Sequence, residues 1–175
     1  DSFFHPNHIN RKDHKLIKRF TETRLGDKNF TKLTNYIIDN DFLSICTPWD
    51  EVAVNYIVQK NYDVIKIASC SFNDWSLLEE VVKQDKFIIA STAGATKLEI
   101  DKVYSFLKHK NKSFALMYCV GEYPTPNSNL HLNQINYLIS NYQNVRIGWS
   151  THEEPNNYEA VKIAISKGAT IFEKH

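Results

Sequence analysis

The chain has 175 residues and a mass of 20.4 kDa, with 42% hydrophobic and 23% charged residues. The near balance of 21 basic and 20 acidic residues disfavours both intrinsic disorder and a nucleic-acid partner. The mean hydropathy of −0.42, the few Gly and Pro residues and the lack of an apolar run of about eighteen residues exclude transmembrane, collagen-like and low-complexity proteins.

The three cysteines, Cys46, Cys70 and Cys119, are widely spaced and form no CxxC pair. A disulfide framework and a zinc ribbon are therefore not expected, and the composition predicts a reducing, cytoplasmic compartment and no membrane partner. The chain begins with Asp1 rather than Met and shows no signal-peptide pattern, so we expect a piece of a longer protein.

Residues 1–40 form a lead-in in which no strand is predicted. A polar and aromatic loop segment comes first, and the patterns of residues 12–24 and 29–39 predict two helices. We treat residues 1–175 as one folding unit, or part of one, because this length suits a single domain with a buried core.

Residues 41–175 alternate short apolar runs, rich in β-branched residues, with longer amphipathic stretches. This alternation is typical of βα units in a parallel sheet and predicts an α/β fold. Six strands are predicted, at residues 42–46, 64–68, 87–90, 114–119, 145–149 and 170–173. Helices are predicted between them, at residues 52–60, 75–84, 97–108, 130–140 and 158–167. Thr96 lies three residues before Glu99, which predicts a capping box.

Polar segments follow every predicted strand. They are residues 47–50, 69–71, 91–94, 121–126, 150–153 and 173–175. In parallel α/β folds, ligands bind where the carboxyl ends of the strands meet the following loops and helix N-termini. Hydroxyl and amide groups at this edge suit an anionic ligand, especially a phosphate.

Two histidines, His152 and His175, lie at or just beyond the ends of consecutive predicted strands. Neighbouring strands would bring both imidazoles within reach of one divalent cation such as Mn²⁺. The alternative, in which both are loop histidines that only form structural hydrogen bonds, stays open.

Lys66 is a charged residue within an otherwise apolar predicted strand. A buried lysine is costly unless an anion or a carboxylate pairs with it, so we expect Lys66 to face a ligand. It could hold a phosphate or carboxylate, or form a Schiff base as a neutral amine. It could also be an edge-strand lysine whose ammonium simply reaches water.

Six segments of the chain together carry a resemblance to a known family. They are 42–50 (FLSICTPWD), 66–69 (KIAS), 91–94 (STAG), 118–119 with 123–126 (YC and YPTP), 148–152 (GWSTH) and 168–175 (GATIFEKH). In this order and spacing they resemble the sialic acid synthase (N-acetylneuraminate synthase) family.

The resemblance implies a TIM (β/α)8 barrel that is partial here, with strands three to eight present and the first two missing upstream. It also implies a transferase that condenses phosphoenolpyruvate with an N-acylated amino-sugar aldehyde, yielding a nonulosonic acid for surface carbohydrate. In such enzymes a divalent metal, Mn²⁺ or Mg²⁺, polarises the aldehyde oxygen for attack by the enol carbon. The full-length protein is expected to be a homodimer.

The resemblance further implies roles for individual residues. His152 and His175 would bind the metal and, with Lys66, take part in catalysis. The side chains that would hold the phosphate and carboxylate of phosphoenolpyruvate are Thr47, Lys66, Ser69, Tyr123 and Ser150. Ser91 and Thr92 would line the floor of the sugar site.

The chain departs from the family pattern at three places. Cys70 and Ser71 stand where a Gly-Glu pair is usual, so a carboxylate is missing beside the sugar. Gly121 stands two residues before Tyr123, where a polar residue such as Asn or Ser is common. Glu122 beside it brings a carboxylate to this loop and is the candidate to replace the missing one in catalysis. The usual Ser-Asp-His reads Ser-Thr-His here, with Thr151 in the middle. Two alternatives to the synthase therefore stay open, a non-catalytic sugar- or metabolite-binding barrel and a Schiff-base lyase that uses Lys66.

Overall fold

The computed structural model describes residues 14–174, except for the side chain of Leu16. The chain divides into two units, residues 1–42 and 43–175. In the first unit the two predicted helices are confirmed as α1 (Lys15–Thr23) and α2 (Asp27–Asp39). Helix α2 ends where the backbone of Asp41 turns to a φ of 59°, and the N–H of Phe42 bonds back to the carbonyl of Ile37.

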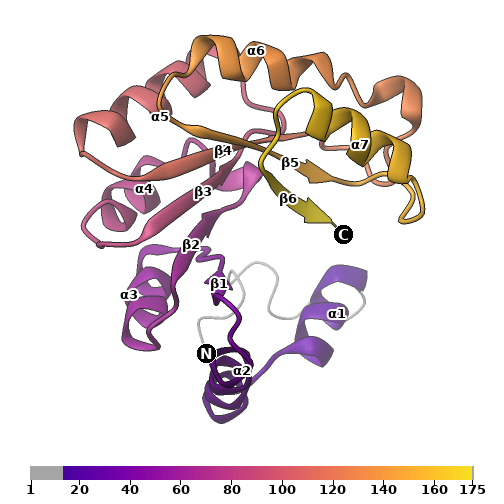
Figure 1. Cartoon of the computed structure of the whole chain (residues 1–175). Helices are drawn as coiled ribbons and strands as arrows, with labels where there is room; N and C mark the ends of the chain where they lie inside the picture. The colour runs from indigo at the N-terminus through magenta and orange to yellow at the C-terminus, as the bar shows by residue number, and fades with distance from the viewer. Residues whose placement is uncertain (1–13, 175) are drawn as a thin grey trace. The chain divides into compact units, whose positions relative to one another are not determined.

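The second unit is built on a parallel sheet. Within residues 14–174 it has six strands in chain order, β1 (Ile45–Cys46), β2 (Val64–Ile67), β3 (Phe87–Ser91), β4 (Phe114–Cys119), β5 (Arg146–Thr151) and β6 (Ile171–Lys174). The connecting helices are α3 (Glu51–Gln59), α4 (Trp75–Val81), α5 (Lys97–His109), α6 (Asn133–Asn141) and α7 (Tyr158–Ser166). Figure 1 shows the sheet curling from β1 to β6, with these helices on its outer face.

This architecture confirms the predicted α/β fold as a curled, half-barrel sheet of the TIM type. The assignment of its strands as the third to eighth of a whole barrel stays a prediction. Within the described part of the chain, no helix has both the length and the apolar composition needed to cross a membrane.

Side-chain caps explain where several helices begin. Thr96 and Glu99 form the predicted capping box at the start of α5, with the Thr96 hydroxyl accepting from the Glu99 N–H and the Glu99 carboxylate accepting from the Thr96 N–H. Asp74 accepts from the N–H of Leu77 at the start of α4. Such caps satisfy N–H groups that have no partner within the helix.

Several predicted element boundaries differ from the structure, and two of the differences have a clear physical reason. The first strand was predicted over residues 42–46, but Phe42 and Leu43 are 70% and 74% exposed and pairing begins at Ile45. The sixth helix segment was predicted over residues 130–140, but α6 begins at Asn133. The backbone of His131 has a φ of 42°, which a right-handed helix cannot accommodate.

The concave face of the sheet carries its own apolar cluster. Successive residues of a strand point to opposite faces, so this face bears every second residue of each strand. The cluster consists of Val64, Ile89, Ala115 and Met117, with Phe87 and Ile171 packed against it. Gly148 completes this layer because a Cβ there would collide with Met117 and would lie 2.5 Å from the carbonyl oxygen of Ile171.

Candidate active site

A polar layer lies directly above the apolar cluster, toward the carboxyl ends of the strands. Each of its members stands two positions after a residue of the cluster, after Gly148 or after Ile171, and therefore on the same face. The polar layer consists of Lys66 on β2, Ser91 on β3, Cys119 on β4, Ser150 on β5 and Glu173 on β6. The sheet thus changes from apolar to polar along its concave face, at the edge where ligands bind in parallel α/β folds.

Lys66 and Glu173 form an ion pair within the polar layer. The Lys66 Nζ lies 3.2 Å from Oε1 of Glu173, and the two side chains are 17% and 29% exposed. A carboxylate of the chain itself is therefore one partner of the buried lysine whose pairing the sequence predicted. Neither the ligand predicted for Lys66 nor its catalytic role is tested by this contact.

Cys119 shares the polar layer with serine hydroxyls. Burial raises the pKa of the Cys119 thiol, while side-chain hydrogen bonds with Ser150 and Ser69 act in the opposite direction. Ser69 belongs to a short 3-10 helix, η2 (Ser69–Ser71), and its hydroxyl accepts from the N–H of Ala93 at 3.2 Å. The structure thus brings two predicted phosphate ligands, Ser69 and Ser150, together around one buried thiol.

The predicted floor of the sugar site is buried. Ser91 is 2% exposed, and its hydroxyl has no hydrogen-bond partner among residues 14–174. Thr92 is 6% exposed, and its hydroxyl donates to the carbonyl of Met117 at 3.0 Å. Thr47 follows β1 and is half-buried. Ser91 therefore has an unused buried hydroxyl, which is a costly arrangement unless a ligand supplies a partner.

His152 is held by the loop that follows β4. Its Nδ1 lies 2.9 Å from the carbonyl oxygen of Val120, and the ring of Tyr123 meets the imidazole edge-on with centroids 5.4 Å apart. Because a carbonyl oxygen can only accept, Nδ1 must carry the proton, and in the neutral ring Nε2 holds the lone pair. This arrangement is the one that metal-binding histidines adopt, so His152 fits the predicted role.

The second predicted metal ligand, His175, lies outside the described residues. Within residues 14–174, no group of three or more His, Cys, Asp or Glu side chains is placed to hold a metal ion. A cation at this edge would therefore need further donors from outside residues 14–174, such as His175 or a bound ligand.

Glu122 belongs to the same loop and is exposed. Its Oε2 accepts from the side-chain amide of Asn129 at 2.9 Å, and its backbone carbonyl accepts from the Thr125 hydroxyl at 2.5 Å. The Glu122 carboxylate is thus hydrogen-bonded within the connection between β4 and α6, to Asn129. Ser71, which stands at the position of the missing carboxylate, is buried in η2.

Three residues of this region were missed by reasoning from sequence. Glu173 and Cys119 complete the polar layer, and Glu153 forms a buried ion pair with Lys174 at the ends of β5 and β6. The alternation of side chains along a strand could have identified Cys119 and Glu173, because it places both on the same face of the sheet as Lys66. The curl of the sheet then brings these side chains toward one another.

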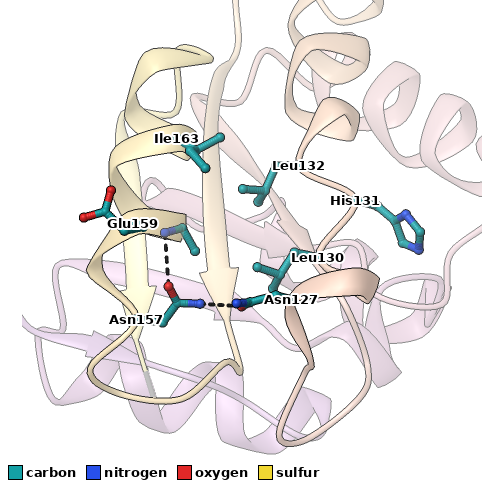
Figure 2. Close-up of a pocket in the computed structure, with 8 residues that line it drawn as sticks. Asn127, Leu130, His131, Leu132, Asn157, Glu159 and Ile163 are labelled. Carbon is teal, nitrogen blue, oxygen red and sulfur yellow. Dashed lines mark hydrogen bonds between the residues drawn. The ribbon is translucent and has the colours of Figure 1, made fainter.

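A separate pocket of about 310 Å³ lies beside α7 (Figure 2). Its polar rim includes Asn127 of the 3-10 helix η3 (Asn127–Asn129), whose side chain accepts a hydrogen bond from Asn157 at 2.6 Å. The lining residues are Asn127, Leu130, His131, Leu132, Asn157, Glu159, Ala160 and Ile163. This set contains none of the predicted site residues.

Comparison with known proteins gives consistent matches. A family model described as the NeuB family matches residues 2–175. A solved structure named spore coat polysaccharide biosynthesis protein E, from Chromobacterium violaceum, is 49% identical, with a TM-score of 0.96 over 100% of this chain and 52% of that chain. N-acetylneuraminic acid (sialic acid) synthetase from Leptospira borgpetersenii, solved in complex with citrate, is 28% identical, with a TM-score of 0.87 over 97% of this chain and 58% of that chain.

A curated relative, N-acetylneuraminate-9-phosphate synthase of Drosophila melanogaster, is 30% identical over 72% of this chain and 34% of its own length. The chain spans about half the length, or less, of the curated relatives it matches.

Proposed function

Because the chain belongs to the NeuB family, we propose that the natural protein condenses phosphoenolpyruvate with an N-acylated amino-sugar aldehyde. The products would be a nonulosonic, sialic-type acid and phosphate, for surface carbohydrate biosynthesis. Sialic acid synthases among the similar proteins support the reaction class. The observation that carries the proposal is the polar layer, which offers a cation and hydroxyls on the concave face at the carboxyl ends of the strands.

Lys66 is the proposed anchor for phosphoenolpyruvate. Its ammonium is largely buried, and a cation in such surroundings attracts a phosphate or carboxylate more strongly than one in bulk water. The hydroxyls of Ser69 and Ser150 would donate to the same anion. Thr47 and Tyr123, which follow β1 and β4 in the sequence, complete the proposed set.

Ser91 and Thr92 are proposed to line the sugar site. The buried Ser91 hydroxyl would gain its missing partner from a hydroxyl or amide group of the amino sugar. Glu122 is the proposed carboxylate for proton transfer beside the sugar, which requires its side chain to leave Asn129. This role would compensate for Ser71, which carries no carboxylate.

His152 and His175 are the proposed ligands of Mn²⁺ or Mg²⁺. The hydrogen bond between Nδ1 and Val120 fixes the ring of His152 and directs its lone pair through Nε2. A bound divalent cation would polarise the aldehyde carbonyl and make its carbon easier to attack.

One observation bears on each of the two alternatives to the synthase. A Schiff-base lyase would need the Lys66 nitrogen to attack a carbonyl carbon, but that nitrogen lies 3.2 Å from the carboxylate of Glu173 and is engaged in an ion pair. The one observation that favours a non-catalytic binding barrel is Ser71, which stands where the family usually has a carboxylate. Such a barrel would bind the substrates without converting them.

We also propose a cytoplasmic location and a homodimer for the full-length protein. Cys46, Cys70 and Cys119 are all free thiols, as expected in a reducing compartment. The proposals of a dimer and of small-molecule substrates rest on the family resemblance.

The test is phosphate release from phosphoenolpyruvate by the complete natural protein, with Mn²⁺ and each of several N-acetylated hexosamines. We expect release that depends on the sugar and is lost in His152→Ala. His109→Ala is the matched control, because His109 is exposed in the last turn of α5 and should be replaceable without loss. Binding of phosphoenolpyruvate without release on any sugar would instead support the non-catalytic barrel.

A further inference from the structure

Among the ion pairs of the described chain, the acidic side chain that is least exposed is that of Glu153. The Lys174 Nζ donates to its Oε1 at 2.6 Å, and the Glu153 side chain is 1% exposed, against 35% for Lys174. Its second oxygen, Oε2, is buried without a hydrogen-bond partner among residues 14–174. A buried carboxylate is costly unless a cation pairs with it, so loss of this contact would leave an uncompensated charge next to the ends of β5 and β6.

The pair joins the ends of two neighbouring strands. The register of β5 and β6 has Thr151 opposite Lys174 as its last pair, and Glu153 follows Thr151 by two residues. The ion pair therefore continues the contact between the strands beyond the last pair of the ladder. The ion pair of Lys162 with Glu159, by contrast, joins two exposed residues near the start of one helix, α7.

His152 lies between the last strand residue and the buried carboxylate. Its carbonyl oxygen accepts from the Thr125 N–H at 2.8 Å, and its Nδ1 contacts the Val120 carbonyl. These two bonds tie His152 to the loop after β4, while Glu153 ties the next residue to β6. In the sequence, Glu153 directly follows one proposed metal ligand, His152, and Lys174 directly precedes the other, His175.

We propose that Glu153 is a positioning residue. Its ion pair with Lys174 fixes the end of β5 against the end of β6, and so holds His152, the residue directly before Glu153, in the position from which it would bind a divalent cation. The inference rests on the proposed function, because it takes the two histidines as metal ligands. Loss of a group that orients metal ligands typically weakens binding by about 10- to 100-fold, and we expect a change of this order here.

The experiment measures Mn²⁺ affinity by calorimetric titration of the complete, metal-free natural protein. Glu153→Gln keeps the shape of the side chain and removes its charge. Glu159→Gln is the matched control, since Glu159 also contacts a lysine at 2.6 Å but on the exposed surface of α7. Lys174→Gln removes the charge from the more exposed side of the pair, and the unfolding temperature of each variant checks that it folds. Lys174→Arg keeps a cation opposite Glu153.

We expect Glu153→Gln and Lys174→Gln to raise the Mn²⁺ dissociation constant about tenfold or more, with Lys174→Arg and Glu159→Gln near wild type. A lower unfolding temperature with unchanged Mn²⁺ affinity in either Gln variant would show a merely structural pair and overturn the positioning role alone. A wild-type protein that binds no Mn²⁺ would overturn the proposed metal site as well, which separates the two failures.

Discussion

The ammonium of Lys66 and the carboxylate of Glu173 lie 3.2 Å apart, although β3, β4 and β5 stand between their strands in the sheet. The contact exists because the sheet curls, which brings the concave faces of β2 and β6 toward each other. A positive and a negative group thus meet above the apolar cluster, beside Cys119 and Ser150. An incoming anionic substrate would share or replace Glu173 as the partner of Lys66.

Replacing Lys66 with methionine should strongly weaken the binding of phosphoenolpyruvate. The variant keeps most of the side-chain volume but removes the charge proposed to hold phosphoenolpyruvate. A hydrogen bond to a charged group is typically worth about 1.5–3 kcal/mol, so we expect kcat/KM for phosphoenolpyruvate to fall roughly 10- to 100-fold. Steady-state phosphate release measures this. Lys97→Met is the control, because Lys97 pairs with Asp101 on the exposed surface of α5. Equal kcat/KM values in the two variants would contradict the assignment of Lys66.

Adding one methyl group at Gly148 should destabilise the protein. The new Cβ would meet Met117 and would come within 2.5 Å of the Ile171 carbonyl oxygen, which belongs to the backbone of β6 and cannot turn away. Gly148→Ala should cost about 1–3 kcal/mol in the free energy of unfolding, measured by urea denaturation. Gly26→Ala adds the same group where no atom lies within 4 Å. A Gly148→Ala variant as stable as Gly26→Ala would show that the concave face is more open than described.

Asp63 should stabilise the fold in a pH-dependent way. Hydrogen bonds from the backbone N–H and hydroxyl of Ser44, both 2.7 Å, hold the pKa of Asp63 below its ordinary value of 3.8. A lowered pKa in the folded state contributes stability above the ordinary pKa and loses it as the pH falls through the folded value.

Asp63→Asn should therefore lower the unfolding temperature at pH 7, and the difference from wild type should shrink in acid, below about pH 4. Thermal unfolding at a series of pH values measures this, with Asp85→Asn at another exposed position as the control. A constant difference between wild type and Asp63→Asn down to strongly acidic pH would argue against these hydrogen bonds.

The three thiols should differ in reactivity. Cys70 is exposed, whereas burial raises the pKa of both Cys46 and Cys119 and keeps them protonated. Iodoacetamide should therefore label Cys70 first in the native protein, as followed by peptide mass spectrometry over time. Phosphoenolpyruvate should slow the labelling of Cys119 further, because Cys119 lies within the proposed phosphate site. Labelling of Cys119 as fast as Cys70 would contradict its burial.

Strands buried on both faces could be predicted well from sequence. The bounds of β4 agree with the prediction because six consecutive apolar residues, all buried, mark such a strand. At β1 the same rule was misleading, since Phe42 and Leu43 are apolar yet exposed. There Ser44 contacts Asp63 through side-chain hydrogen bonds, so pairing starts later than hydrophobicity suggests.

The sequence predicted which residues belong to the candidate site better than it predicted the contacts between them. A lone lysine in an apolar strand indicated an anionic partner, but the identity of that partner depends on the curl of the sheet, which brings Glu173 across from another strand. Glu153 looked like part of a polar loop. Its burial follows from the register of β5 and β6, which a single sequence does not reveal.

The most direct test of the proposed reaction is mass spectrometry of the organic product that the complete natural protein forms from phosphoenolpyruvate and N-acetylated hexosamines with Mn²⁺. The synthase predicts one new acid that contains the carbons of both substrates, formed in step with the phosphate released and absent in His152→Ala. Free pyruvate with the sugar unchanged, or no conversion on any sugar, would contradict the condensation.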